Sequence, residues 1–319
     1  MGFFMQKKYI FIIFICSFAL SYRWLNTGGD ETTHQSQEIS SLQVKTPDQK
    51  IENKELVSAK KEIKPKLNLQ ALEKLKQQSE DPSFLPFDNE GNIYIENVVI
   101  DEQWAVAHGD VLVGNAESIL QLEKDGLPLV LAKPKLWNDG VIPFVIDSSI
   151  PSDQKNEILK AVNILNQQTV VKFEEAKSQE DKILFKSGGT HCYSYVGRIG
   201  GTQDLVLSSD CQAPQIIHEM LHALGFYHEQ SRPDRDEYLQ ILWENIEQKY
   251  FEQFKKMPPL HSSITESQFD YQSIMLYPSY AFSIGPTDPS ILTIDGEEYS
   301  PLKTLSSGDI EKIRLLYRD

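Results

Sequence analysis

The chain has 319 residues, more than one average domain, and a formal net charge of -15 at pH 7. Hydrophobic residues make up 40% of it and charged residues 24%, which is typical of a soluble globular protein. The negative charge argues against nucleic acid as a partner, since that requires a basic face, and against docking on anionic lipid by charge alone.

The first residues have the pattern of an export signal. Lys7 and Lys8 precede an almost continuously apolar run, residues 9–20, and small residues follow at the spacing that a signal peptidase requires. The run is shorter than the ~20 residues of a membrane-spanning helix. Residues 1–21 are therefore predicted to be a signal peptide and the protein to be secreted. A membrane anchor formed by an uncleaved segment is the alternative.

Cysteine use fits an exported chain. One of the three cysteines, Cys16, lies inside the signal and leaves with it. The remaining pair, Cys192 and Cys211, is predicted to form a disulfide, which contributes about 3 kcal/mol by closing the loop between them. Two buried free thiols are the alternative.

The next part of the chain changes character near residue 80. Residues 22–80 are polar, charged and poor in aromatic residues, which is typical of a disordered leader. After them the apolar density rises, and short strands are predicted at residues 93–95, 98–100 and 111–113.

From residue 135 the pattern becomes that of a mixed α/β region. The strands predicted here cover residues 141–146, 170–173, 183–185, 193–196 and 205–207. Pro143 lacks an N–H group and so indicates an edge position for the first of them. A helix is predicted to begin near Pro151, where apolar residues recur at helical spacing.

Three further helices are predicted. One begins with Pro214 in its first turn and stops at Gly225. Another covers residues 242–254, and a short amphipathic helix covers residues 309–317 near the end of the chain.

Three of the seven histidines fall within eleven residues, at His218, His222 and His228. The first two are four residues apart, so they lie on the same face of a helix and can reach one ion. Gly225 can adopt the left-handed backbone that turns the chain back, and His228 then supplies a third nitrogen. Three imidazoles with a fourth position open are typical of a catalytic zinc site. One Zn²⁺ per chain is therefore predicted.

Glu219 follows the first histidine and faces the open position. A carboxylate there can take a proton from zinc-bound water, the predicted nucleophile, and pass it to a leaving amine. The full run His218-Glu219-Met-Leu-His222-Ala-Leu-Gly225-Phe-Tyr-His228 is the metzincin form of the zinc motif.

The sequence resembles the astacin family of zinc metalloendopeptidases at two further places. The zinc motif continues as Glu229-Gln-Ser-Arg-Pro-Asp-Arg-Asp, like the astacin signature, and Ser-Ile-Met275-Leu-Tyr277 resembles the family's Met-turn. The likeness runs from Trp137 to Tyr317. It implies an α+β, metzincin-like catalytic domain in which a mixed twisted sheet and the active-site helix precede a mostly irregular C-terminal subdomain.

The resemblance also implies roles for single residues. Met275 would be the apolar floor beneath the metal, and Tyr277 an extra zinc ligand that swings away to stabilise the tetrahedral intermediate. Glu229 would bond, through water, to the amino terminus that activation exposes. The predicted edge strand for an extended polypeptide substrate consists of Cys192, Tyr193, Ser194 and Tyr195.

Upstream, Ala-His108-Gly109-Asp110-Val resembles the inhibitory motif of astacin propeptides. Asp110 would fill the fourth zinc position and keep a zymogen inactive. His108 is a competing candidate ligand. The alternative is that Gly109-Asp110 is a turn without any role at the metal. Residues 81–130 are thus predicted to be an inhibitory propeptide and 131–319 the catalytic domain. The expected partners are a polypeptide substrate and an activating protease, with the chain a monomer.

Two other functions fit the same residues. A zinc-bound binding module without catalysis would be favoured by loss of the glutamate, but Glu219 is present. A structural domain in which zinc only stabilises the fold would need a fourth protein ligand permanently in place.

Overall fold

The computed structural model describes residues 61–63, 83–88, 92–258 and 267–318. The predicted signal peptide and nearly all of the predicted leader lie outside these residues. The chain divides into Met1–Ser58 and Ala59–Asp319, and every described residue belongs to the second unit. Among the described residues no helix is both long and apolar enough to cross a membrane.

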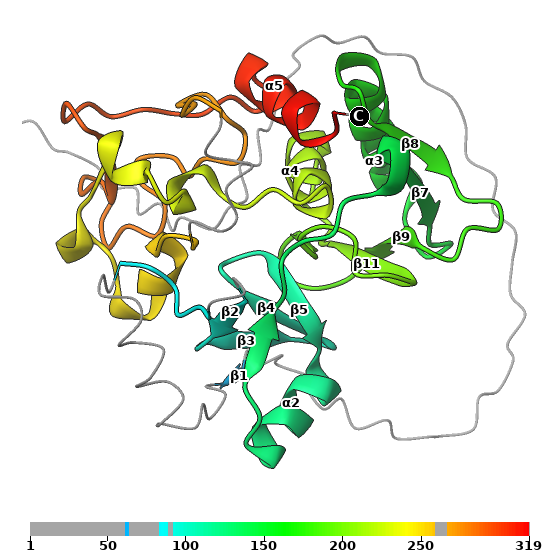
Figure 1. Ribbon diagram of the computed structural model, residues 1–319, viewed down its shortest axis with the longest axis horizontal. Coiled ribbons are helices and arrows are strands. Elements are labelled where there is room, and N and C mark those ends of the chain that lie inside the picture. Colours follow the sequence, from blue (N-terminus) through cyan, green and yellow to red (C-terminus); the bar gives the residue numbers. More distant parts are fainter. Residues whose placement is uncertain (1–60, 64–82, 89–91, 259–266, 319) are drawn as a thin grey trace, which may run out of the picture. The chain divides into compact units, whose positions relative to one another are not determined.

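The segment predicted to be a propeptide is built from short strands and one helix (Figure 1). These elements are β1 (Lys61–Ile63), β2 (Ile93–Ile95), β3 (Val98–Asp101), β4 (Trp104–Ala107), β5 (Val111–Asn115), α2 (Ala116–Asp125) and β6 (Leu129–Leu131). The three strands predicted here are confirmed. The side chain of Asn115 accepts a hydrogen bond from the Ser118 N–H and so caps α2, and Gly126 ends the helix in the left-handed conformation.

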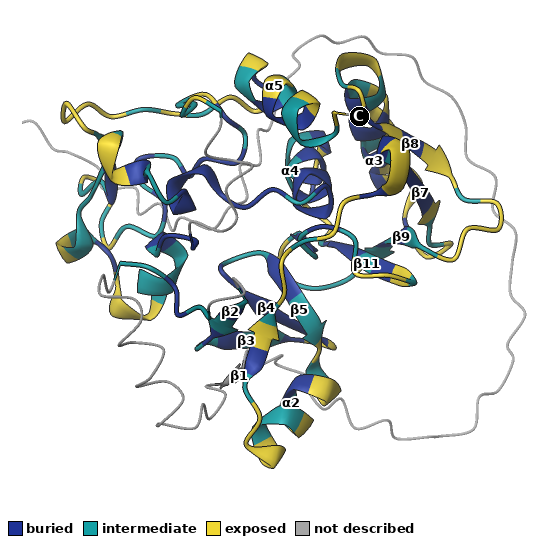
Figure 2. Cartoon of the chain, in the orientation of Figure 1, coloured by how far each residue is buried: buried dark blue, intermediate teal, exposed yellow. Residues whose placement is uncertain are grey.

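The sheet region that follows matches the predicted order of elements. It consists of η1 (Asn138–Gly140), β7 (Val141–Ile146), α3 (Ser152–Gln168), β8 (Lys172–Glu175), β9 (Lys182–Ser187), β10 (Tyr193–Ser194), β11 (Thr202–Leu207) and α4 (Ala213–Ala223). Helices α3 and α4 pack on each other and on the sheet (Figure 1). Figure 2 shows α4 mostly buried, because the main apolar core surrounds it.

After His228 the described chain is mostly irregular. It contains the 3-10 turns η2 (Glu229–Ser231), η3 (Arg235–Glu237), η4 (Trp243–Asn245) and η5 (Gln248–Phe254), the strands β12 (Leu239–Ile241) and β13 (Ile291–Thr293), and helix α5 (Ser307–Leu316). The architecture is therefore α+β with a mixed sheet, as predicted. The α-helix predicted over residues 242–254 is wrong, because this stretch forms two 3-10 segments whose aromatic side chains join a local core.

Among the described residues, one sheet of nine strands runs through both the predicted propeptide and the region that matches the predicted catalytic domain. Its order is β1-β3-β4-β5-β10-β11-β9-β7-β8, with β10 antiparallel to β11 and parallel to β5. Strand β7 lies between β9 and β8, so the edge position inferred from Pro143 is wrong. The Phe144 carbonyl accepts from Ala176 on the β8 side, so Pro143 faces β9. Because the ladder with β9 begins only at Phe144, the missing N–H removes no bond.

Candidate metal centre

The first two histidines project from α4 toward one point. The imidazole of His222 is fully buried, and its ring centre lies 4.8 Å from those of His218 and His228. The Nδ1 of His218 lies 2.9 Å from the Ile274 carbonyl, and that of His222 lies 2.7 Å from the Phe226 carbonyl. A carbonyl only accepts, so each Nδ1 carries the proton and each Nε2 keeps a lone pair for a metal.

The third histidine reaches the same point because the chain reverses after the helix. Gly225 has φ 108, a conformation that favours glycine, and its N–H bonds to the carbonyl of His222 at 2.8 Å. Beyond this turn, His228 brings its Nε2 to within 3.2 Å of the His218 Nε2. Gly225 thus lies at the point where the chain turns after the helix.

Asp110 lies against all three histidines. Its Oδ2 is 3.3 Å from the Nε2 of His218 and 3.2 Å from that of His228, and its Oδ1 is 3.3 Å from that of His222. Four ligands about 2.0–2.1 Å from a tetrahedral zinc lie about 3.3–3.4 Å from one another. The spacing of these four side chains therefore fits one zinc ion at their centre.

Unpaired polar atoms support the same conclusion. The Nε2 of His222 and the Oδ1 of Asp110 are buried without a hydrogen-bond partner in the part of the chain that the structure describes. Such atoms are uncommon in folded proteins because their desolvation is costly. A cation between them removes that cost, and the described residues that could hold it are Asp110 and the three histidines.

The two carboxyl groups at the centre, those of Asp110 and Glu219, have pKa values shifted in opposite directions. Burial alone would raise the pKa of Asp110, but the neighbouring His228, His222 and His218 outweigh it and hold that pKa well below its ordinary value. Burial, and then the charge of Asp110, raise the pKa of Glu219 well above its ordinary value. Glu219 is 3% exposed, and its Oε2 has no partner among the described residues.

His108, the competing ligand, lies outside the group of metal-binding side chains. It is buried, and burial followed by the charge of His228 lowers its pKa to about 4, so its imidazole is neutral. Its ring donates instead to the backbone of Glu252. The structure thus brings Asp110, and not His108, to the three histidines.

The Met-turn lies below this centre. Met275 is 3% exposed, belongs to the main core, and accepts a backbone hydrogen bond from Glu229 at 2.9 Å. The ring of Tyr277 packs beside His228, with the centroids 4.6 Å apart. Its hydroxyl donates to the His108 carbonyl at 3.4 Å. A Cβ on Gly109 would lie 2.8 Å from this hydroxyl, so only glycine permits the close approach.

Glu229 is buried and already paired. Its Oε1 accepts from Lys312 at 2.6 Å, from Arg232 at 3.2 Å and from the N–H of Asp270 at 3.0 Å. Beside it lies a cavity of about 10 Å³, room for about one water molecule. Sequence reasoning missed Lys312, since nothing in the local pattern of the last helix marks it as buried.

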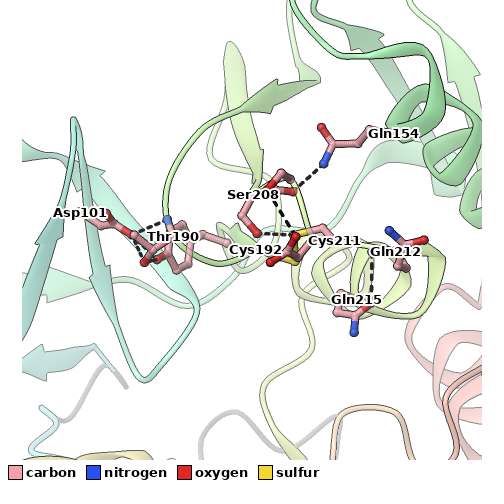
Figure 3. The surroundings of a disulfide bond; sticks show 11 residues. Asp101, Gln154, Thr190, Cys192, Ser208, Cys211, Gln212 and Gln215 are labelled. Atoms are coloured by element: carbon pink, nitrogen blue, oxygen red, sulfur yellow. Dashed lines mark hydrogen bonds between the residues drawn. A yellow bond between two sulfur atoms is a disulfide. The ribbon is translucent and has the colours of Figure 1, made fainter. Parts of the chain in front are cut away.

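The predicted substrate edge is covered in this structure. Strand β10 holds only Tyr193 and Ser194 of the four predicted residues, and the Ser194 N–H donates to the Asp110 carbonyl at 3.1 Å. The disulfide between Cys192 and Cys211 is confirmed, and it fixes the chain just before this strand (Figure 3).

The zinc site is of the metzincin kind, because the third histidine arrives only after the helix has ended at a glycine turn. Together with the α+β fold around it, this defines the class: a zinc metallopeptidase catalytic domain.

The chain belongs to the astacin family. Residues 130–318 match the model of the peptidase family described as Astacin. The chain is 37% identical over 170 residues to zinc metalloproteinase nas-8 of Caenorhabditis elegans, covering 53% of this chain and 41% of that protein. It is 33% identical over 215 residues to nas-4 of the same nematode, covering 66% and 68%. The chain spans about half the length of the curated relatives it matches.

A solved structure is also similar. It is high choriolytic enzyme 1, a hatching enzyme zinc-protease from the medaka fish Oryzias latipes, with 36% identity and a TM-score of 0.53. The match covers 58% of this chain and 93% of that one.

Proposed function

We propose that this chain is the latent precursor of a secreted zinc endopeptidase that cleaves internal peptide bonds of proteins. The observation that carries the proposal is the position of Asp110, whose carboxylate lies 3.2–3.3 Å from the three histidine nitrogens. A carboxylate there occupies the fourth position, which a catalytic zinc site keeps open.

The chain's own residues supply the remaining chemistry. Bound zinc supplies a Lewis acid that activates a water molecule and polarises the scissile carbonyl. The Glu219 carboxylate accepts a proton from the attacking water and returns it to the leaving amine. Once the propeptide has left, the Tyr277 hydroxyl loses its His108 partner and is free to donate to the developing oxyanion.

Substrate would bind where β5 now lies. The pairing of β5 with β10 uses backbone groups, and an added strand is bound in this way largely regardless of its side chains. A polypeptide taking the place of β5 on Tyr193 and Ser194 would be held across the metal centre. Cleavage of longer polypeptides, and not of dipeptides alone, is the corresponding expectation.

Release would begin at the end of α2. Lys124, Asp125, Gly126 and Leu127 form a continuous exposed run, the kind of site that proteases cut. An activating protease acting between Lys124 and Lys133 would break the covalent link between the propeptide and the catalytic domain.

The new amino terminus would then move toward Glu229. That carboxylate already has two cationic partners, so the terminus would join a paired group. The small cavity beside Glu229 has room for the water that such a contact would use.

The second candidate function is that of a structural domain in which zinc only stabilises the fold, because the position of Asp110 would let it serve as a fourth protein ligand. A peptidase assay separates the two. The chain is freed of the residues before about Leu131 and tested on an unfolded protein with and without a chelator. Chelator-sensitive cleavage supports the peptidase, while a zinc-loaded and folded domain without any cleavage would contradict it.

A further inference from the structure

The loop that joins β9 to β10 donates hydrogen bonds to two carboxylates of the propeptide. The backbone N–H of Thr190 donates to the Oδ2 of Asp101 at 2.8 Å, and its hydroxyl donates to the same oxygen at 2.6 Å. The hydroxyl of Tyr193 is a third donor, at 2.5 Å. The N–H of Gly189 donates to the Oε2 of Glu102 at 3.3 Å. Figure 3 shows Asp101 facing Thr190 across this contact.

Burial makes these bonds necessary. Asp101 is 1% exposed, and a buried carboxylate is stable only when donors compensate its lost hydration. Hydrogen bonds to a charged group are stronger than those between neutral groups. The three donors to Asp101 come from Thr190 and Tyr193, which belong to the catalytic region. The catalytic region therefore forms the binding site, and the Asp101 carboxylate fills it.

The shape of the loop fits this occupant. Gly188 and Gly189 have φ of 146 and 66, and a Cβ on Gly188 would lie 2.4 Å from the Cη2 of Trp104. The loop thus presents bare backbone to the indole ring, whose N–H donates to Asp204 at 3.0 Å. Trp104 is 3% exposed, in one apolar cluster with Tyr193 of β10 and Val206 of β11.

The turn that carries Asp101 and Glu102 is itself held in an unfavourable backbone conformation. Glu102 has φ 55, which is uncommon for residues other than glycine. Its bond to Gly189 is one of the contacts that hold the turn there. The loop is fixed in advance, since Cys192 at its end is joined to Cys211. A fixed receiving loop loses little conformational entropy when the turn binds.

We infer that the loop of residues 188–193 is a carboxylate-binding site of the catalytic domain, filled here by Asp101 and Glu102, and that it anchors the propeptide independently of zinc. None of the residues that make the contact belongs to the metal-binding group. The inference rests on the proposed latency and adds a consequence. Cutting the exposed segment after α2 does not by itself release the propeptide, which stays bound as a non-covalent inhibitor.

The test uses the full chain with a recognition sequence for a site-specific protease inserted between Gly126 and Leu127, both exposed. After the cut, size-exclusion chromatography over a dilution series measures how much of the propeptide fragment remains with the catalytic part. The cut parent is expected to retain its fragment, also after zinc removal by a chelator. Asp101→Asn is expected to raise the dissociation constant about 10–100-fold, because hydrogen bonds to a charge contribute about 1.5–3 kcal/mol.

Glu117→Gln is the matched control, since Glu117 is an exposed propeptide carboxylate in the first turn of α2. It should leave retention unchanged. If Asp101→Asn does not fold, Thr190→Val removes one donor from the receiving side. If the Asp101→Asn or Thr190→Val protein retains its propeptide fragment as tightly as the parent does, the anchor is overturned. Peptidase activity in the uncut parent would instead contradict the proposed latency, since fragment retention is measured without any activity.

Discussion

Replacing Asp110 by alanine in the uncut chain should open the metal centre. The carboxylate lies 3.2–3.3 Å from the three imidazole nitrogens, where it would be the fourth zinc ligand. We take this contact to be at least as strong as a hydrogen bond to a charged group, about 1.5–3 kcal/mol. Removing it should therefore lower the stability of the closed state about 10–100-fold, since 1.4 kcal/mol corresponds to a factor of ten. The apparent affinity for a hydroxamate that needs the open state should rise by the same factor.

The assay is titration of the uncut Asp110→Ala chain and its parent with a hydroxamate, with zinc content measured in both. Glu117→Ala, which removes an exposed carboxylate of the same segment, serves as the control. An Asp110→Ala chain that keeps its zinc and yet binds hydroxamate no better than the parent would refute the reasoning. The block would then come from the pairing of β5 with β10 or from His108.

Further expectations concern the catalytic and electrostatic groups. Glu219→Gln in the activated enzyme should keep zinc, because Glu219 is not among the ligands, and should lower kcat about 10²–10⁴-fold; near-normal turnover by a zinc-loaded variant would contradict its role as the base. Tyr277→Phe should also keep zinc and lower kcat by a smaller factor. Burial raises the pKa of Glu252 to about 7 from 4.5. The folded chain therefore binds an extra proton in that range, and its stability should fall as pH rises from about 4.5 to 7. Glu252→Gln should remove that part of the pH dependence of Tm, and an unchanged dependence would exclude Glu252 as its source.

The elements that the sequence predicted best are those with a long local pattern. Helices α3, α4 and α5 follow apolar residues at helical spacing. The start of α3 and both ends of α4 and α5 are predicted within a few residues of those observed. The stretch over residues 242–254 has apolar residues at similar spacing but forms 3-10 turns, because its aromatic side chains pack into a separate small core. Tertiary packing determines the conformation of this stretch, and the spacing of its apolar residues does not reveal that packing.

The residues of the metal centre also differ in how well the sequence predicted them. Its three histidines lie within eleven residues of one helix and turn, so their meeting could be read from the sequence. Asp110 is 118 residues away from His228, and only the resemblance to propeptides suggested the contact. The pairing of Lys312 with Glu229 and the site that holds Asp101 left no local signal, since both depend on which distant segments become neighbours.

The two contacts of the propeptide depend on different physical forces, which affects how latency could be released. The contact at Asp110 is made at the predicted metal centre, so it should weaken when zinc is lost. The contact at Asp101 rests on hydrogen bonds from Thr190 and on a buried indole ring, and neither needs zinc. A chelator should therefore disable the enzyme without freeing the propeptide. Since the binding of two linked contacts is cooperative, release should require removal of both or digestion of the segment that joins them.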